Sequence, residues 1–134
     1  MYFKDCIIWT YYPPNKKCYR LFVTKKTWVE ARDRCRRFPS GELASIPNPD
    51  TQNFLNNELD ANNCWFGGKP TNQPDNGTWE WLDGTPWSWT HWMTGHPNKA
   101  EPNQRLFYKA RQGRDWISRS GSVECFFMCQ YDKP

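Results

Sequence analysis

The six cysteines are the feature that most constrains what this chain of 134 residues can fold into. Their number is even, and none of them form a C-x-x-C pair; the closest two, Cys125 and Cys129, have three residues between them. With only His91 and His96 as further ligands, the sequence lacks the tight, repeated Cys/His spacing of a structural zinc site. We therefore predict three disulfides, for which fifteen pairings exist, in a protein of an oxidising compartment.

The apolar composition supports the same conclusion. Ile, Leu, Val and Phe together supply only 21 of the 134 residues, a share typical of disordered chains. Nine Trp, six Tyr and a net charge of only +4 argue against disorder. We predict one domain over residues 1–134, with a core built from aromatic rings and stapled by disulfides.

Charge and hydropathy exclude two classes of partner. An excess of four positive charges without a concentrated basic stripe does not indicate nucleic-acid binding. No apolar run approaches the roughly 20 residues of a membrane-spanning helix. The N-terminal segment also lacks the apolar stretch of a signal peptide, so we expect a mature secreted chain or an extracellular domain. The sequon Asn76-Gly77-Thr78 is consistent with that location and makes Asn76 a candidate glycosylation site.

Local signals predict two helices followed mainly by strands. Thr27 and Glu30 form a capping box that begins a helix, and Pro39 and Gly41 end it. A second helix begins at Asn48-Pro49 and runs to about residue 59. Strands are predicted at 18–23, 65–68, 79–82, 106–109, 115–117 and 125–131. This order indicates an α+β fold with an antiparallel sheet.

The segment 83–105, here called the long loop, holds few strand-forming residues and many Pro, Gly, Asn and Trp. A loop of this length in a compact domain is usually functional.

Taken in order, these motifs resemble the C-type lectin-like domain over essentially the whole chain. The motifs that carry the resemblance are Cys18-Tyr19, Thr27-Trp28-x-x-Ala31-x-x-x-Cys35, Gly41-x-Leu43-Ala44-Ser45-Ile46, Trp65-Phe66-Gly67-Gly68, Gly77-x-Trp79-x-Trp81-x-Asp83-Gly84, Trp92-x-x-Gly95-x-Pro97-Asn98, Trp116 and Phe126-Phe127-Met128-Cys129-Gln130. The resemblance implies a double-loop fold with two helices packed on antiparallel sheets. It also implies that the long loop forms the ligand face.

The resemblance also implies disulfide pairings. By position, Cys35 pairs with Cys129, and Cys6 pairs with Cys18 as in the long form of the domain. The family's remaining bridge has lost its cysteines here. Cys64 and Cys125 match no family cysteine, and we expect them to form a substitute bridge.

Sugar binding in the family typically uses a calcium ion, which needs six to eight oxygen ligands. The family's Glu-Pro-Asn or Gln-Pro-Asp triplet falls on His96-Pro97-Asn98, its following Glu near Gln104, and its Asn-Asp pair on Ile117-Ser118. No carboxylate remains at these positions to balance the charge of the ion. We therefore expect no metal ligands and no cofactor, with calcium disfavoured.

Two other triplets spell calcium motifs. Gln73-Pro74-Asp75 lies before the long loop and is interpreted as turn chemistry. Glu101-Pro102-Asn103 lies in the long loop but five residues late, and would need a rearranged loop that uses Asp115. That alternative stays open from the sequence.

Without calcium, the long loop must recognise its ligand by hydrogen bonds and stacking. The candidate ligand-binding residues are Trp87, His96, Asn98, Glu101, Asn103, Gln104 and Arg105. No nucleophile with a base, nor a pair of carboxylates, indicates catalysis, so an enzyme is not expected. We predict a secreted glycan-binding module; the alternative is a protein-binding receptor ectodomain, immune or venom-type module. With no spare cysteine, we expect a monomer or a non-covalent dimer.

Overall fold

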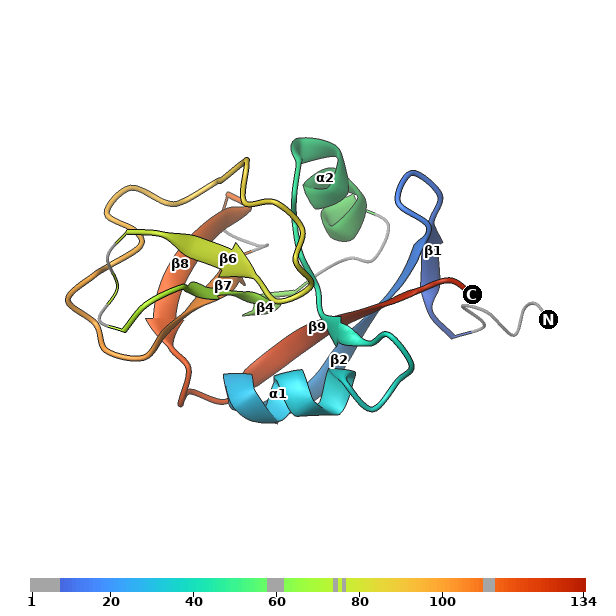
Figure 1. Cartoon of the computed structure of the whole chain (residues 1–134), viewed down its shortest axis with the longest axis horizontal. Helices are drawn as coiled ribbons and strands as arrows, with labels where there is room; N and C mark the ends of the chain where they lie inside the picture. The colour runs from blue at the N-terminus through green and yellow to red at the C-terminus, as the bar shows by residue number, and fades with distance from the viewer. Residues whose placement is uncertain (1–7, 58–61, 74, 76, 110–112) are drawn as a thin grey trace.

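The computed structural model describes residues 8–57, 62–73, 75, 77–109 and 113–134. Figure 1 shows the chain as two helices packed against a twisted sheet. The elements in chain order are β1 (Thr10–Tyr12), β2 (Lys17–Lys26), α1 (Trp28–Cys35), β3 (Glu42–Leu43), α2 (Pro49–Asn57), β4 (Cys64–Trp65), β5 (Gly68–Pro70), β6 (Trp79–Trp81), β7 (Gln104–Lys109), β8 (Asp115–Ser120) and β9 (Cys125–Asp132). The predicted α+β class is confirmed.

In the described part of the chain, the main sheet has the strand order β1-β2-β9-β4-β7-β8, and β3 pairs with β9 beside β4. The pairs are antiparallel except β4 with β9, which is parallel. The sheet is therefore mixed rather than purely antiparallel, because the short β4 lies between two strands that run in opposite directions. β5 and β6 form a separate antiparallel pair.

Helix α1 forms for the reason that the sequence indicates. The Thr27 hydroxyl accepts the Glu30 N–H at 3.3 Å, and the Glu30 carboxylate accepts the Thr27 N–H at 3.0 Å. This capping box satisfies two backbone donors at the start of the helix. Trp28, Ala31 and Cys35 lie on one face and are fully buried against the sheet. The helix ends at Cys35, before the predicted Pro39 limit.

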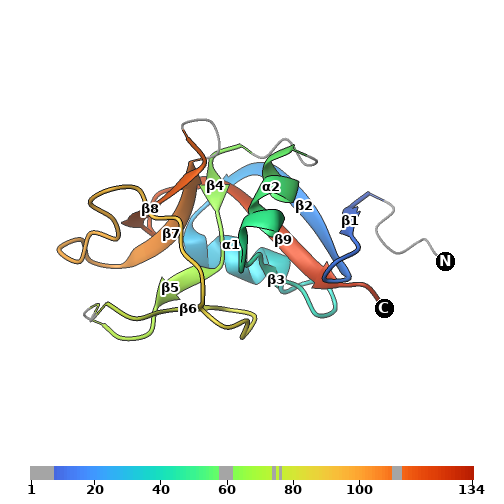
Figure 2. The ribbon, with the colours of Figure 1, turned by 90° about the horizontal axis from the view of Figure 1, so that it is seen from above.

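The sheet separates two cores, because side chains alternate between its faces along each strand. Figures 1 and 2 together show α1 and α2 on opposite sides of the sheet. One core holds Trp28, Leu43 and Phe127 and lies beneath α1. The other holds Leu55 of α2 and the tryptophans of β6 and β8, and the long loop packs against it.

The Cys35–Cys129 disulfide joins α1 to β9, as the resemblance implies. Cys18 is also disulfide-bonded. Its predicted partner, Cys6, lies outside the described residues, and so does the candidate glycosylation site Asn76.

The predicted Cys64–Cys125 bridge is wrong, because both residues are buried free thiols. The parallel register of β4 and β9 pairs Cys64 with Phe126. Neighbouring side chains on a strand point to opposite faces, so Cys64 enters the core beneath α2 and Cys125 the core beneath α1. Adjacent backbones therefore carry the two thiols on opposite sides of the sheet.

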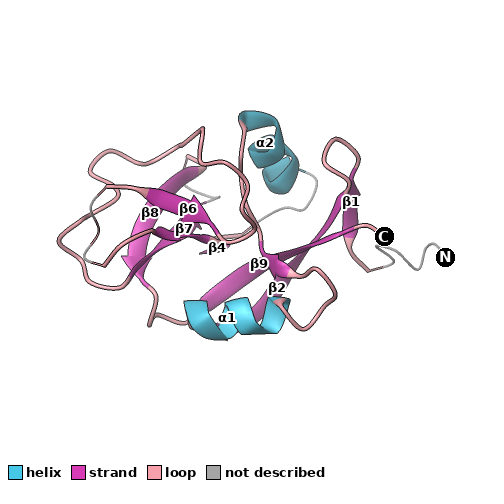
Figure 3. Cartoon of the chain, viewed as in Figure 1, coloured by secondary structure: helices cyan, strands magenta, loops and turns pink. Residues whose placement is uncertain are grey.

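The long loop crosses one end of the molecule, on the side away from β1 and the C-terminus (Figures 1 and 3). An isolated β-bridge pairs Trp92 of the loop with Trp116 of β8. β7 begins at Gln104, so the last two residues predicted for the loop belong to a strand. Neither described helix is long and apolar enough to cross a membrane.

Candidate functional site

The long loop is held in place by backbone hydrogen bonds to β8. The Met93 N–H donates to the Trp116 carbonyl at 2.8 Å, and the Trp116 N–H donates to the His91 carbonyl at 2.9 Å. The Trp89 and Trp92 rings contact Trp116 edge to face. These contacts give a loop without regular secondary structure a fixed path.

Trp87, a predicted ligand-binding residue, belongs mainly to this anchoring cluster. Its ring centroid lies 4.6 Å from that of Trp81 and 5.9 Å from that of Trp116. It also stacks on Trp79 and contacts Trp92. Trp87 is half-buried, so only part of its ring is open to a ligand.

His96 and Asn98 are both hydrogen-bonded to Ser118 of β8. The Ser118 N–H donates to His96 Nδ1 at 3.0 Å, and the Ser118 hydroxyl lies 3.2 Å from the same nitrogen. The Asn98 N–H donates to the Ser118 oxygen at 2.7 Å. Ser118 is only 5% exposed and thus joins the long loop to β8 by hydrogen bonds. We call these hydrogen bonds among His96, Asn98 and Ser118 the His96–Ser118 clamp.

The clamp requires a neutral imidazole, because His96 Nδ1 must accept a hydrogen bond from the Ser118 N–H. Burial lowers the pKa of His96 below its usual range, and the positive charge of Lys109 lowers it further. The peptide bond between His96 and Pro97 is cis.

Gln104 faces the protein interior. The residue is 1% exposed, and its amide Nε2 lies 3.4 Å from the Asp75 carboxylate. Its Oε1 has no hydrogen-bond partner among the described residues. Asp75 also accepts the Gly77 N–H at 2.7 Å, the turn chemistry predicted for this segment. Pro74 lies outside the described residues.

Three predicted site residues are exposed on the loop itself: Asn98, Glu101 and Asn103. Asn98 Oδ1 accepts the Ala100 N–H at 3.1 Å, which makes a local turn. Asn103 has a φ of 56°, a left-handed conformation that Asn tolerates better than most residues. Together with the half-buried His96, these side chains form the polar surface of the loop, here called the loop face.

Arg105 is not part of the loop face. Its guanidinium lies 4.6 Å from the centre of the Trp28 ring of α1, and its Nη1 donates to the Gln104 carbonyl at 2.7 Å. Because Gln104 and Arg105 are neighbours on a strand, their side chains point to opposite faces of the sheet. Arg105 follows the loop directly in the sequence, but its side chain lies against Trp28 and away from the loop face.

The alternative calcium set, Glu101 with Asp115, is also separated by the strand register. Gln104, just after Glu101-Pro102-Asn103, pairs with Ser120, whereas Asp115 pairs with Lys109 at the other end of β8. One Asp115 carboxylate oxygen lies 3.2 Å from His91 Nε2. Ser118 was not among the residues predicted for the site, although the family resemblance aligns the family's Asn-Asp pair with Ile117-Ser118.

Comparison with known proteins places this geometry in a family. The Lectin C-type domain model matches residues 24–131. C-type lectin lectoxin-Lio3 of Erythrolamprus poecilogyrus is 37% identical over 127 residues, which cover 90% of this chain and 78% of that protein. The hepatic lectin of Gallus gallus is 28% identical, and the match covers 94% of this chain but only 59% of that protein.

Solved structures share the fold. A calcium-independent type II antifreeze protein superposes with a TM-score of 0.82 at 25% identity, covering 94% of this chain and 92% of that one. The C-type lectin CEL-I from Cucumaria echinata gives 0.78 at 22% identity, covering 89% and 92%. The chain therefore belongs to the C-type lectin family, whose domains bind ligands rather than catalyse reactions.

Proposed function

We propose that this domain binds a glycan through the loop face without calcium, outside the cell. The observation that carries the proposal is the His96–Ser118 clamp. At the positions where the family holds calcium, His96 Nδ1 is hydrogen-bonded to Ser118, and the Ser118 hydroxyl oxygen accepts the Asn98 backbone N–H. The loop is then shaped by protein hydrogen bonds instead of by a metal.

The donor chemistry does not fit a calcium ion. Calcium prefers six to eight oxygens with several carboxylates, whereas the clamp offers an imidazole nitrogen, a hydroxyl and a backbone amide. Among the described residues, no group of three or more His, Cys, Asp or Glu side chains could hold a metal. One solved relative is itself described as calcium-independent, which supports a metal-free form of this fold.

A glycan suits the groups that the loop face exposes. The amides of Asn98 and Asn103 donate and accept hydrogen bonds, and the Glu101 carboxylate accepts them, as sugar hydroxyls require. The exposed part of Trp87 offers a flat surface for the CH face of a ring. An extracellular location is supported by the Cys35–Cys129 disulfide and by the lectin relatives.

A glycan array probed in calcium buffer and again in EDTA tests the proposal. We expect the same sugars to bind in both buffers. The double variant Glu101→Gln/Asn103→Gly removes two loop-face groups, and glycine keeps the left-handed backbone at position 103. We expect it to lose at least tenfold in affinity for the array hits.

Glu80→Gln is the matched control, because Glu80 is an exposed carboxylate on β6 that forms an ion pair with Lys69, away from the loop face. It should bind as the unmodified domain does. Binding that disappears in EDTA would contradict calcium independence. An absence of glycan signal in both buffers would instead favour protein recognition.

A further inference from the structure

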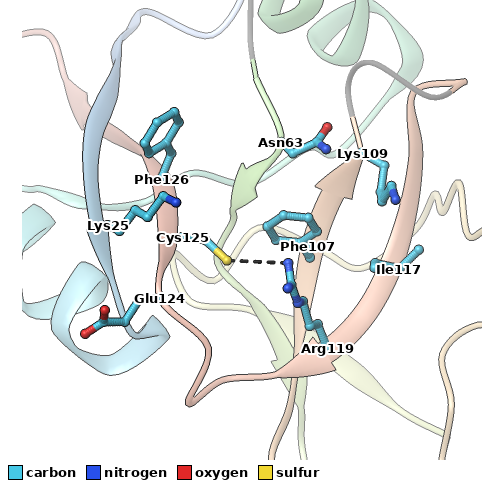
Figure 4. A pocket seen from close by; sticks show the side chains of 9 residues that line it. All are labelled: Lys25, Asn63, Phe107, Lys109, Ile117, Arg119, Glu124, Cys125 and Phe126. Carbon is cyan, nitrogen blue, oxygen red and sulfur yellow. Dashed lines mark hydrogen bonds between the residues drawn. The ribbon is translucent and has the colours of Figure 1, made fainter.

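A second concave site lies on the sheet away from the loop face. Figure 4 shows its lining, which comes from β2, β7, β8, β9 and the residues just before β4 and β9. The hollow encloses about 510 Å³, within the range of about 300–1,000 Å³ for small-molecule pockets. Its lining residues are Lys25, Asn63, Phe107, Lys109, Ile117, Arg119, Glu124, Cys125 and Phe126.

The strand register separates this hollow from the loop face. On β8, Ser118 points to the long loop, so its neighbours Ile117 and Arg119 point to the opposite side of the sheet. On β7, Phe107 pairs with Ile117 and belongs to the core beneath α1. The hollow is thus an opening in that face of the sheet, separate from the loop face.

The charges in the hollow are unbalanced. Lys25, Lys109 and Arg119 are three cations against one carboxylate, Glu124. None of the three makes an ion pair with another described residue within 4 Å. In Figure 4, Glu124 lies at the rim and points away from Arg119. Asp115 lies opposite Lys109 in the strand register, but its carboxylate contacts His91 and not Lys109. A negative charge in the hollow would therefore meet three cations that are not engaged in ion pairs.

The Arg119 side chain is held in the hollow by two contacts. Its guanidinium lies 4.9 Å from the centre of the Phe107 ring, and Nη1 is 3.6 Å from the Cys125 sulfur. These contacts fix the side chain, and its remaining N–H groups have no acceptor among the described residues. A guanidinium fixed in this way can donate two parallel hydrogen bonds to a carboxylate or sulfate.

The floor of the hollow is apolar. Phe107, Ile117 and Cys125 line it on the face beneath α1. Phe107 and Cys125 are only 4% and 7% exposed, so the half-buried Ile117 presents most of this apolar surface. An inorganic anion would leave this floor in contact with water, whereas an aromatic or alkyl group would cover it. The combination of an apolar floor with a cationic rim complements an amphiphilic anion.

We propose that this hollow binds a small organic anion in which a carboxylate or sulfate head is joined to an aromatic or short alkyl body. The head lies against Arg119 with Lys25 and Lys109 beside it, and the body covers Phe107 and Ile117.

Amide NMR titration with 2-naphthalenesulfonate and with 2-naphthoate tests the proposal on the intact domain. We expect saturable shifts concentrated at Phe107, Ile117 and Arg119, and the tighter of the two probes identifies the preferred head group. Inorganic sulfate and uncharged 2-naphthalenemethanol should each bind at least about tenfold more weakly, because each lacks one half of the ligand.

The variant Lys25→Gln/Lys109→Gln should weaken binding of the preferred probe by about tenfold or more. The matched control Lys16→Gln/Lys133→Gln makes the same charge change at two exposed lysines near the other end of β9, and should leave affinity unchanged. Equal losses in both variants, shifts scattered over the surface, or equal binding of the uncharged probe would overturn the proposal. If a variant fails to fold, the amide shifts of the unmodified domain still test the proposal, because they show whether the probes bind at Phe107, Ile117 and Arg119.

Discussion

Removal of the Ser118 hydroxyl should release the long loop from β8. In Ser118→Ala, the Asn98 N–H loses its acceptor at 2.7 Å and His96 Nδ1 loses its neighbour at 3.2 Å. The Ser118 N–H still donates to His96, so the strand itself stays intact. The change therefore acts on the loop and not on the sheet.

The magnitude follows from the two lost hydrogen bonds. Each contributes about 0.5–1.5 kcal/mol, and the exposed Asn98 can turn its N–H toward water, so we expect a loss of about 1–2 kcal/mol in unfolding free energy. For a domain of this size the melting temperature should fall by about 3–6 °C. Ser122→Ala, at an exposed serine of the next turn, should cost less than about 0.5 kcal/mol.

Hydrogen exchange locates the effect. The Asn98 amide should exchange faster in Ser118→Ala, whereas the Gly121 amide, which donates to the Asn103 carbonyl at 2.9 Å, should keep its protection. Unchanged stability together with unchanged exchange at Asn98 would refute the role assigned to the clamp.

Three further predictions concern stability and the thiols. Urea unfolding of Cys35→Ala/Cys129→Ala should show a loss of about 4–5 kcal/mol, because the bridge closes a separation of 94 residues; a loss below about 1 kcal/mol would count against the entropic argument. Because the pKa of folded His96 lies below its ordinary value of 6.5, the unfolded chain takes up that proton first as the pH falls. Melting temperatures should therefore decline as the pH drops from about 6.5 through the folded pKa, and the decline should be larger in the unmodified domain than in His96→Gln. Parallel curves for the two proteins would show that His96 does not contribute to this pH dependence. Alkylation in denaturant without reductant, followed by peptide mapping, should label Cys64 and Cys125, and a recovered Cys64–Cys125 peptide would show that they are bridged instead.

Much of the fold could be predicted because its signals are local or occur in a fixed order. The Thr27–Glu30 capping box involves four consecutive residues, and the buried face of α1 follows from helical periodicity. The Cys35–Cys129 pairing came from the ordered family motifs instead. The second helix was predicted from its cap, although its expected end near Leu59 lies outside the described residues.

The site was less predictable because it depends on strand register and on packing between distant segments. The strand of β7 was predicted to begin at Leu106, so Gln104 and Arg105 were both assigned to the loop. Their true position in the strand sends one inward and the other toward Trp28. A one-residue offset between β4 and β9 likewise places Cys64 and Cys125 on opposite faces, which composition and spacing do not reveal.

The most direct test of the account is the melting temperature of the EDTA-treated domain with added calcium, compared with equal magnesium. A ligand that binds only the folded state must raise the free energy of unfolding. We predict the same melting temperature in millimolar calcium and in magnesium. The reason is that the His96 imidazole and the Ser118 hydroxyl stand where a calcium site would need carboxylate ligands. A rise of several degrees that is specific to calcium, and lost on renewed chelation, would contradict the account.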